Sequence, residues 1–95
     1  MEPNKTEEFY TRLKAQLEDT AIWPTAYLYK FILPTDENKI REIHTIFDNL
    51  GAVINSKQSK KGTYTSVSVN VTLPSADAVI EKYKAVGAIE GVISL

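Results

Sequence analysis

Residues 65–73 read TSVSVNVTL, the most strongly periodic stretch in the chain. Apolar side chains occupy every second position from Val67 to Leu73, and the positions between them are polar. Because successive side chains of a strand point to opposite faces, this alternation predicts a strand with one buried face and one polar face. The buried face is expected to hold Val67, Val69, Val71 and Leu73. The polar face is expected to hold Tyr64, Ser66, Ser68, Asn70 and Thr72.

Three further segments have the composition of strands, at residues 26–33, 52–59 and 90–95. The first reads AYLYKFIL and carries apolar side chains on both faces, with Lys30 as its one charge, which is typical of a central strand. The second is short and polar, and residues 60–62 (KKG) form the turn that joins it to the alternating strand. The third is uncharged from Val92 to Leu95 and is expected at an edge of the sheet.

A thin apolar stripe marks residues 6–19 as an amphipathic helix. Asn4 or Thr6 is expected to supply its N-cap oxygen. Because the stripe is too small to stabilise an isolated helix, this helix is expected to pack on the domain or on a partner chain. The stripe consists of Phe9, Leu13 and Leu17, with Tyr10 beside them.

Two more segments, between residues 36 and 51 and between residues 75 and 87, repeat apolar residues every three or four positions, which is the spacing of a helix. Thr35 or Asp36 is expected to cap the first of them, and Gly51 to follow its last turn. Ser75 is expected to cap the second, and Gly87 to end it. The inner stripe of the first holds Ile40, Ile43, Phe47 and Leu50. The inner stripe of the second holds Ala76, Val79, Ile80 and Tyr83.

The order of these segments is one helix followed by a βαββαβ unit. Two right-handed crossovers on one side of a sheet give an α+β ferredoxin-like fold, with four antiparallel strands in the order 4-1-3-2 and two helices on one face. We expect two parts: residues 1–20 as a helical extension and residues 21–95 as a single ferredoxin-like domain. Trp23-Pro24 lies at this boundary, where the proline disfavours helix at the preceding residue.

The composition excludes several kinds of chemistry. The 95 residues carry 11 basic and 12 acidic side chains, a net charge of −1, with one histidine and no cysteine. A disulfide, a thiol nucleophile and a cysteine metal site are therefore excluded, and His44 has no serine and acid at a motif spacing. The sequence contains no metal-site or cofactor fingerprint, so we expect no enzyme activity and no cofactor. Without an apolar leader or an apolar run of membrane length, the expected location is the cytoplasm.

Four motifs together resemble the YbeD-like family of small bacterial proteins of unknown function. They are the Trp23-Pro24 pair, the aromatic strand of residues 27–31 (YLYKF), the hairpin of residues 59–68 (SKKGTYTSVS) and residues 92–95 (VISL). The resemblance covers about residues 23–95, and the chain departs from it in a longer N-terminal helix and one extra lysine in the hairpin. It implies a ferredoxin-like fold similar to ACT-type regulatory domains, and it implies no particular activity.

The hairpin and the polar sheet face are the candidate binding surface. Residues 51–73 hold Lys57, Lys60 and Lys61 and no acidic residue, so this segment can attract an anion within a nearly neutral chain. Gly62 can free backbone N–H groups for the same purpose. The alternative is a solvated turn whose lysines protect an edge strand, beside a face covered by solvent or by the N-terminal helix. The candidate ligand- or partner-binding residues are Lys30, Lys60, Lys61, Gly62, Tyr64, Ser66 and Ser68.

These features favour a non-enzymatic binding or regulatory module that contacts a protein partner or a small anionic ligand. The alternative is a weak nucleic-acid binder that uses the lysines together with Tyr64. It has less support, because RNA-binding sheets stack bases on two or three aromatic side chains and Tyr64 is the one that qualifies here. The uncharged last strand adds an expectation about assembly: it either pairs in a homodimer through the sheet edge or is covered by the N-terminal helix.

Overall fold

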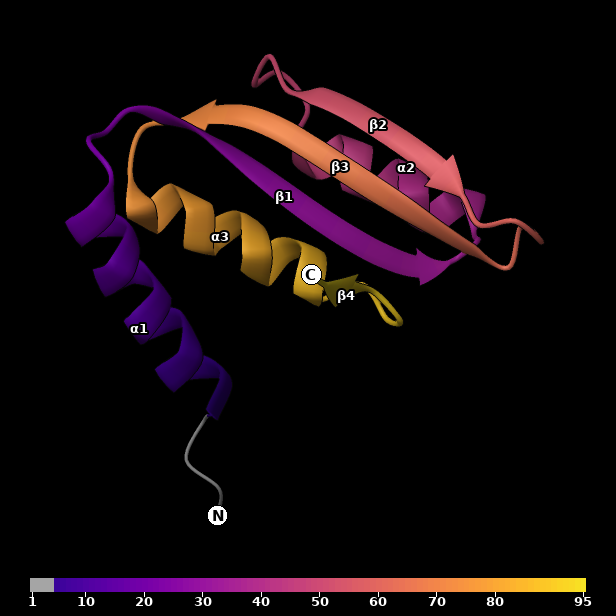
Figure 1. Ribbon diagram of the computed structural model, residues 1–95, viewed down its shortest axis with the longest axis horizontal. Coiled ribbons are helices and arrows are strands. Elements are labelled where there is room, and N and C mark those ends of the chain that lie inside the picture. Colours follow the sequence, from indigo (N-terminus) through magenta and orange to yellow (C-terminus); the bar gives the residue numbers. More distant parts are fainter. Residues whose placement is uncertain (1–4) are drawn as a thin grey trace.

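The computed structural model describes residues 5–95 (Figure 1). The four strands form one antiparallel sheet in the order β2-β3-β1-β4, which is the predicted order 4-1-3-2 counted from the opposite edge. The predicted α+β ferredoxin-like arrangement is therefore confirmed, with β1 and β3 in the centre. The elements are α1 (Lys5–Thr20), β1 (Thr25–Pro34), α2 (Glu37–Ile46), β2 (Val53–Gln58), β3 (Tyr64–Leu73), α3 (Ala76–Gly87) and β4 (Ile93–Ser94).

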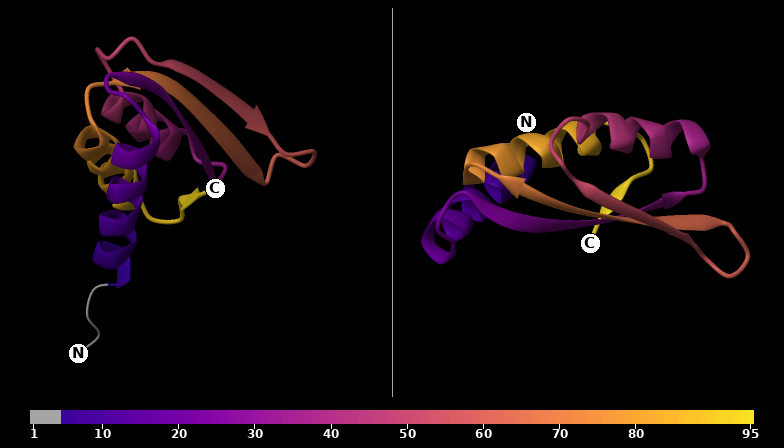
Figure 2. Two further views of the ribbon diagram at one scale, coloured as in Figure 1. Left: turned by 60° about the vertical axis from the view of Figure 1, so that its left-hand side comes forward. Right: turned by 90° about the horizontal axis from the view of Figure 1, so that it is seen from above.

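The alternation in β3 sorts its side chains between the two faces as predicted. The odd-numbered residues from Thr65 to Leu73 are buried, and the even-numbered ones are exposed except for the half-buried Ser68. Figure 2 shows α2 and α3 on one side of the sheet, and these helices bury the odd-numbered side chains of β3. We call the other side of the sheet, which α2 and α3 leave uncovered, the open face.

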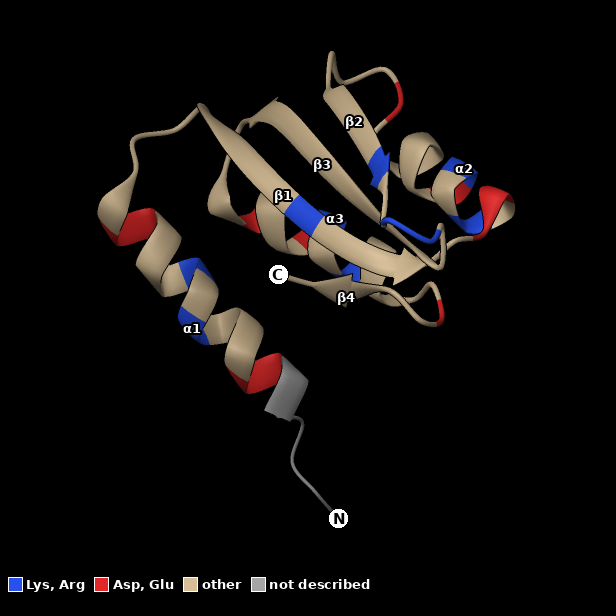
Figure 3. Ribbon diagram, turned by 45° about the vertical axis from the view of Figure 1, so that its right-hand side comes forward, with Lys and Arg blue, Asp and Glu red and all other residues tan. Residues whose placement is uncertain are grey.

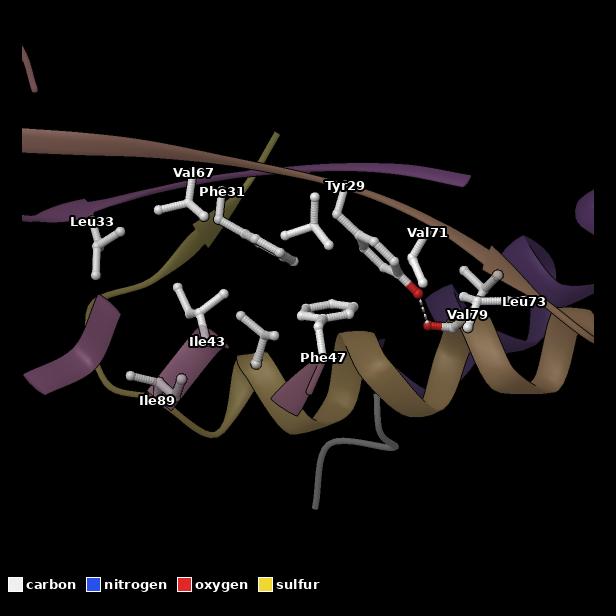
Figure 4. Packing of buried hydrophobic residues seen from close by; sticks show 12 residues of the cluster. Tyr29, Phe31, Leu33, Ile43, Phe47, Val67, Val71, Leu73, Val79 and Ile89 are labelled. Atoms are coloured by element: carbon white, nitrogen blue, oxygen red, sulfur yellow. Dashed lines mark hydrogen bonds between the residues drawn. The ribbon is translucent and has the colours of Figure 1, made fainter. Parts of the chain in front are cut away.

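Aromatic side chains from β1 and the two covering helices fill the core. The rings of Tyr29 and Phe31 stack with centroids 5.7 Å apart, and Phe47 of the α2 end packs against Tyr29 at 5.1 Å (Figure 4). The Tyr29 hydroxyl donates a 2.9 Å hydrogen bond to the Val79 carbonyl, which satisfies the one polar group that this ring brings into the core. Trp23 is partly buried and packs against the same cluster just before β1 begins.

Local signals set the starts of the two covering helices. The Asp36 carboxylate accepts hydrogen bonds from the Asn38 and Lys39 amides at 3.0 and 3.2 Å, so Asp36 rather than Thr35 is the N-cap of α2. The Ser75 hydroxyl accepts from the Ala78 amide at 3.2 Å and caps α3, as predicted.

The end of α2 differs from the prediction. The helix stops at Ile46, and the chain then turns through Asn49 and Gly51, which both have positive φ angles, 63° and 71°. Gly51 thus has the left-handed backbone expected of it, but one turn later than a C-cap. Because the helical period does not continue past Phe47, Leu50 leaves the buried stripe and is 38% exposed, so its predicted burial is wrong.

The N-terminal helix packs antiparallel on α3. Its Lys14 ammonium lies 2.8 Å from the Asp77 carboxylate, and its Glu7 carboxylate lies 3.6 Å from the Lys84 ammonium. The predicted stripe is wrong at Phe9, which is 57% exposed; the half-buried side is formed by Tyr10, Leu13 and Leu17. This position also corrects the expectation that α1 covers the open face or the last strand.

Two N-cap candidates for α1 were available in the sequence. Thr6 lies inside the helix, so it is not the N-cap. Asn4 lies outside the residues that the structure describes.

No helix within residues 5–95 combines the length and the apolar character needed to cross a bilayer.

The last strand is much shorter than the predicted residues 90–95. β4 pairs with β1 only at Ser94 opposite Phe31 and Ile93 opposite Ile32, and the Leu95 amide donates a 2.8 Å bond to the Lys30 carbonyl. Glu90 and Gly91 form a turn instead, with φ 88° at Gly91 and the Lys39 ammonium 2.7 Å from the Glu90 carbonyl. As a result β4 accompanies only the second half of β1.

Candidate binding surface on the open sheet face

The pairing register arranges the open-face side chains in rows across the sheet. Residues directly opposite each other in neighbouring strands project to the same face. One row consists of Asn55, Ser68 and Lys30, from β2, β3 and β1. The next row consists of Lys57, Ser66, Ile32 and Ile93 and reaches β4.

The predicted site residues fall into two groups. Lys30, Ser66 and Ser68 lie together in the middle of the open face, with Lys30 directly opposite Ser68. Tyr64 is 49% exposed on the same face, at the end of β3 next to the hairpin. Lys60 and Lys61 are exposed in the turn beyond it, so they extend the surface without joining its centre (Figure 3).

Lysines give this surface a positive charge. Lys30 and Lys57 project from the strands, Lys60 and Lys61 lie at the hairpin tip, and residues 49–76 contain no acidic residue. Both ion pairs found within the described residues join α1 to α3, so neither neutralises these four lysines. Because none of the acidic residues within residues 5–95 lies in a strand, an approaching anion meets local positive charge despite the net charge of −1.

The hairpin turn uses some of the groups that the sequence suggested for binding. The Gly62 amide donates a 2.8 Å bond to the Ser59 carbonyl, with φ 73° at Gly62. The Gly62 amide is therefore not among the N–H groups that the hairpin can offer to an anion, because closing the turn already uses that donor. The Ser66 hydroxyl likewise donates to the Lys57 carbonyl at 3.3 Å, which leaves its oxygen as an acceptor.

A shallow hollow lies between the hairpin and the centre of the open face. Its volume is about 190 Å³, which leaves room for a small inorganic anion. The Lys57 ammonium and the hydroxyls of Ser59 and Tyr64 are the polar groups able to hold an anion there. The lining residues are Ile32, Lys57, Gln58, Ser59, Tyr64 and Ser66.

The hollow at the hairpin is separate from a larger one, of about 390 Å³, at the end of α2. That second hollow is lined by His44 and Asp48 among others, and the His44 side chain is exposed there. Within residues 5–95, no three side chains of His, Cys, Asp or Glu gather closely enough to hold a metal ion.

The tyrosines with the most perturbed acidity lie in the core and not on the open face. Burial raises the pKa of Tyr29 and of Tyr83 well above the ordinary value of a tyrosine, and neighbouring tyrosines add to both shifts. Tyr83 also shares a 2.8 Å hydrogen bond between its hydroxyl and that of Tyr27. These hydroxyls therefore serve packing, and they are out of reach of a ligand on the open face.

Sequence reasoning placed Leu28 and Ile32 beside the polar residues of this surface but missed the rest of its apolar part. Leu28 is 50% exposed, Val53 61%, Ile93 61% and Leu95 72%, and the register places all four on the open face. With Tyr64 they make up five of the eight large hydrophobic side chains exposed in the described part of the chain. The alternation of Leu28, Lys30 and Ile32 was visible in the sequence, but the positions of Val53 and Ile93 beside them require the strand register.

Comparison with known proteins places the chain among proteins of unknown function. A family model described as a protein of unknown function (DUF493) matches residues 18–95. Two Vibrio vulnificus proteins, UPF0250 protein VV0902 of strain YJ016 and UPF0250 protein VV1_0282 of strain CMCP6, are each 35% identical over 82 residues, covering 80% of this chain and 86% of the relative.

The fold also matches a solved structure. The solution structure of protein HP0495 from H. pylori has a TM-score of 0.65 and 19% identity, over 80% of this chain and 86% of that one. At this identity the likeness shows the fold alone. The family match over residues 18–95 and the 35% identity to the Vibrio relatives confirm the resemblance, and the chain belongs to the DUF493 family, the YbeD-like UPF0250 proteins of unknown function.

Proposed function

We propose that this protein is a non-enzymatic binding module whose open face contacts a partner protein or a small anionic ligand. One observation carries the proposal: the face left uncovered by the helices combines four lysines, no acidic residue in any strand and five exposed large hydrophobic side chains. Exposed apolar side chains that gather on one face mark interaction sites in soluble domains. Local positive charge selects and steers an acidic partner to such a face.

A regulatory role is the specific form of binding that the similarity to ACT-type domains suggests. That suggestion rests on likeness of fold, and folds of this kind carry many different functions. The binding proposal itself rests on the surface of this chain. It does not depend on the analogy.

Nucleic-acid binding is the competing proposal, and the arrangement of aromatic rings gives it less support. A sheet that binds single strands needs aromatic side chains on which successive bases stack. On β1 the rings of Tyr27, Tyr29 and Phe31 belong to the core side, which leaves Tyr64 as the aromatic side chain of the open face in the described strands. The lysines alone favour any anionic partner, including a protein.

Site-specific photo-crosslinking in the native cell tests the proposal. A photoreactive amino acid replaces Asn70, which is exposed on the open face, and in a matched variant it replaces Glu42, which is exposed on α2. We expect a defined crosslinked product from position 70 and none from position 42, because only the first position lies on the proposed surface. Products from position 42 alone, or from neither position, would contradict the proposal.

A further inference from the structure

We infer that the open face binds an acidic amphipathic helix of a partner protein, aligned with β1. This inference rests on the proposed function and adds the chemistry and shape of the partner. It depends on how apolar and charged side chains are divided across the open face. Two sets of residues define that division. The apolar strip consists of Leu28, Ile32, Ile93 and Leu95, and the lysine flank consists of Lys57, Lys60 and Lys61.

The apolar strip has the dimensions of one helix stripe. Leu28 and Ile32 are four residues apart in β1, which corresponds to about 13 Å along the strand. Ile93 lies directly opposite Ile32 in β4, and Leu95 lies opposite Lys30. The strip is therefore two strands wide, and the other exposed apolar side chains of the open face, Val53 and Tyr64, lie outside it on β2 and β3. A helix with apolar residues at i, i+4 and i+7 presents a stripe of about 10 Å, so two to three turns cover the strip.

A helix fits this place better than an extended segment. Extended peptides join a sheet by hydrogen bonding to an edge strand, whereas a sheet face buries its apolar side chains under a helix or a second sheet. Here α2 and α3 already cover the other face in that way. A partner helix would complete a helix–sheet–helix sandwich.

The lysines determine which helix fits. Lys57 lies two strands away from the apolar strip, about 10 Å across the sheet, which is close to the diameter of a helix. A helix lying on the strip therefore brings one of its sides to Lys57, and one end toward Lys60 and Lys61. Lys30 projects within the strip itself. Acidic residues on the side of the helix that faces β2 would complement the three ammonium groups of the lysine flank.

A second copy of this chain is a weaker candidate for the same place. Its available helix is α1, and Phe9 is the one large apolar side chain that residues 7–20 expose. Leu13 and Leu17 are half-buried on the side of α1 that packs on the domain. A single exposed ring does not supply the apolar stripe that would cover the strip.

Peptide binding to the full-length chain tests the inference. The probe is a fluorescent peptide of about four helical turns, with leucines at helical spacing and glutamates on both sides of them. One control peptide has lysines in place of the glutamates, and a second has serines in place of the leucines. We expect each control to bind at least about tenfold more weakly than the probe, because one loses the charge match and the other the apolar stripe.

Variants of the chain then locate the contact. Leu28→Ser and Lys57→Glu should each weaken binding of the probe by about fivefold or more, because they change the two sides of the proposed site. Arg41→Glu makes the same change of charge at an exposed position on α2 and should leave affinity within about twofold. Circular dichroism of each variant establishes that its fold is intact.

Several outcomes would overturn the inference. Equal binding of the lysine peptide, or an unchanged affinity in both Leu28→Ser and Lys57→Glu, would remove its physical basis. A single-stranded oligonucleotide that displaces the probe at equal or lower concentration would identify nucleic acid as the occupant. If no peptide binds while position 70 still crosslinks to a partner, the proposed function stands and the helix is wrong; if both fail, both proposals are wrong.

Discussion

Val69 and Asn70 are neighbours in β3 with opposite surroundings. Val69 has no exposed surface, whereas Asn70 is exposed on the open face. An aspartate at position 69 would bury an unpaired carboxylate among apolar side chains. We predict that Val69→Asp destabilises the protein by about 3–5 kcal/mol or unfolds it, as measured by urea denaturation.

Asn70→Asp is the matched control for this change. It introduces the same carboxylate one residue later and nearly preserves the shape of the side chain. Because the group stays in water, its unfolding free energy should remain within about 0.5 kcal/mol of the unmodified protein. Equal losses in the two variants would mean that the faces of β3 are assigned wrongly.

Tyr29 makes a second prediction at the residue scale, this time about pH. Burial raises its pKa in the folded state, whereas in the unfolded chain it ionises at about pH 10. Below that pH the contribution of the neutral hydroxyl to stability is fully present. Above it the unfolded state loses the proton while the folded state retains it, so stability falls as pH rises.

Unfolding free energies measured from neutral pH to above pH 10 should therefore decline at the alkaline end, with a shallower slope in Tyr29→Phe. That variant also loses the hydrogen bond to the Val79 carbonyl, at a cost of about 1 kcal/mol at neutral pH. Tyr64→Phe, at a half-exposed position outside the core, is the matched control for removal of a tyrosine hydroxyl. If Tyr29→Phe shows the same slope as the unmodified protein, the alkaline loss of stability does not come from Tyr29.

At the scale of elements, features set by neighbouring residues were predictable from the sequence. The capping by Asp36 and Ser75 and the alternation in β3 depend on residues within a few positions of each other. The end of α2 was not predictable in this way. Leu50 continues the helical spacing in the sequence, but the chain leaves the helix at Phe47. The length of β4 depends on the turn at Gly91, which packs near Lys39 and Pro34 from distant parts of the chain.

The N-terminal helix provides the prediction at this scale. It adds only half-buried side chains, Tyr10, Leu13 and Leu17, to the outside of α3, whereas the core cluster lies between the sheet, α2 and α3. Deleting residues 1–20 should leave a cooperatively folding domain that is less stable by about 2–4 kcal/mol and binds a dye for apolar surfaces more strongly. Loss of cooperative unfolding would instead make α1 part of the core.

Asp77→Ala separates the ion pair from the apolar packing of α1. It removes the partner of Lys14 while Leu13 and Leu17 stay in place. Because both charged side chains are exposed and water screens their attraction, the urea midpoint should hardly change.

At the scale of the whole molecule, the sequence indicated where charge is concentrated but not how the surface is assembled. The lysines around Tyr64 were evident, because they lie in one acid-free segment. The apolar strip was not evident, because Leu28 and Ile93 are far apart in the chain and only the register brings their strands together. The packing position of α1 was also not predictable from the sequence, because a thin apolar stripe does not specify the surface on which a helix packs.

Assembly through the β4 edge is the prediction at this scale. The helix α1 leaves that edge uncovered, and no charged side chain protects Val92 to Leu95. We therefore predict a homodimer in which two copies pair β4 with β4, with twice the 10.6 kDa mass in light scattering at micromolar concentration. Because the chain has no cysteine, Ser94→Cys should form a crosslinked dimer on oxidation, and Glu42→Cys on α2 should not. A monomer mass at all concentrations would contradict this pairing.

The short β4 divides β1 into a central half and an edge half. The Lys30 carbonyl points toward β4, so the alternation of the backbone directs the amides of Ala26 and Leu28 to the same side, beyond the end of β4. The amides of Tyr27 and Tyr29 point toward β3 instead. In deuterated water the two sets should exchange their hydrogens at very different rates, fast at Ala26 and Leu28 and slow at Tyr27 and Tyr29. One strand would then show protection that alternates residue by residue in its first half and becomes continuous where β4 begins.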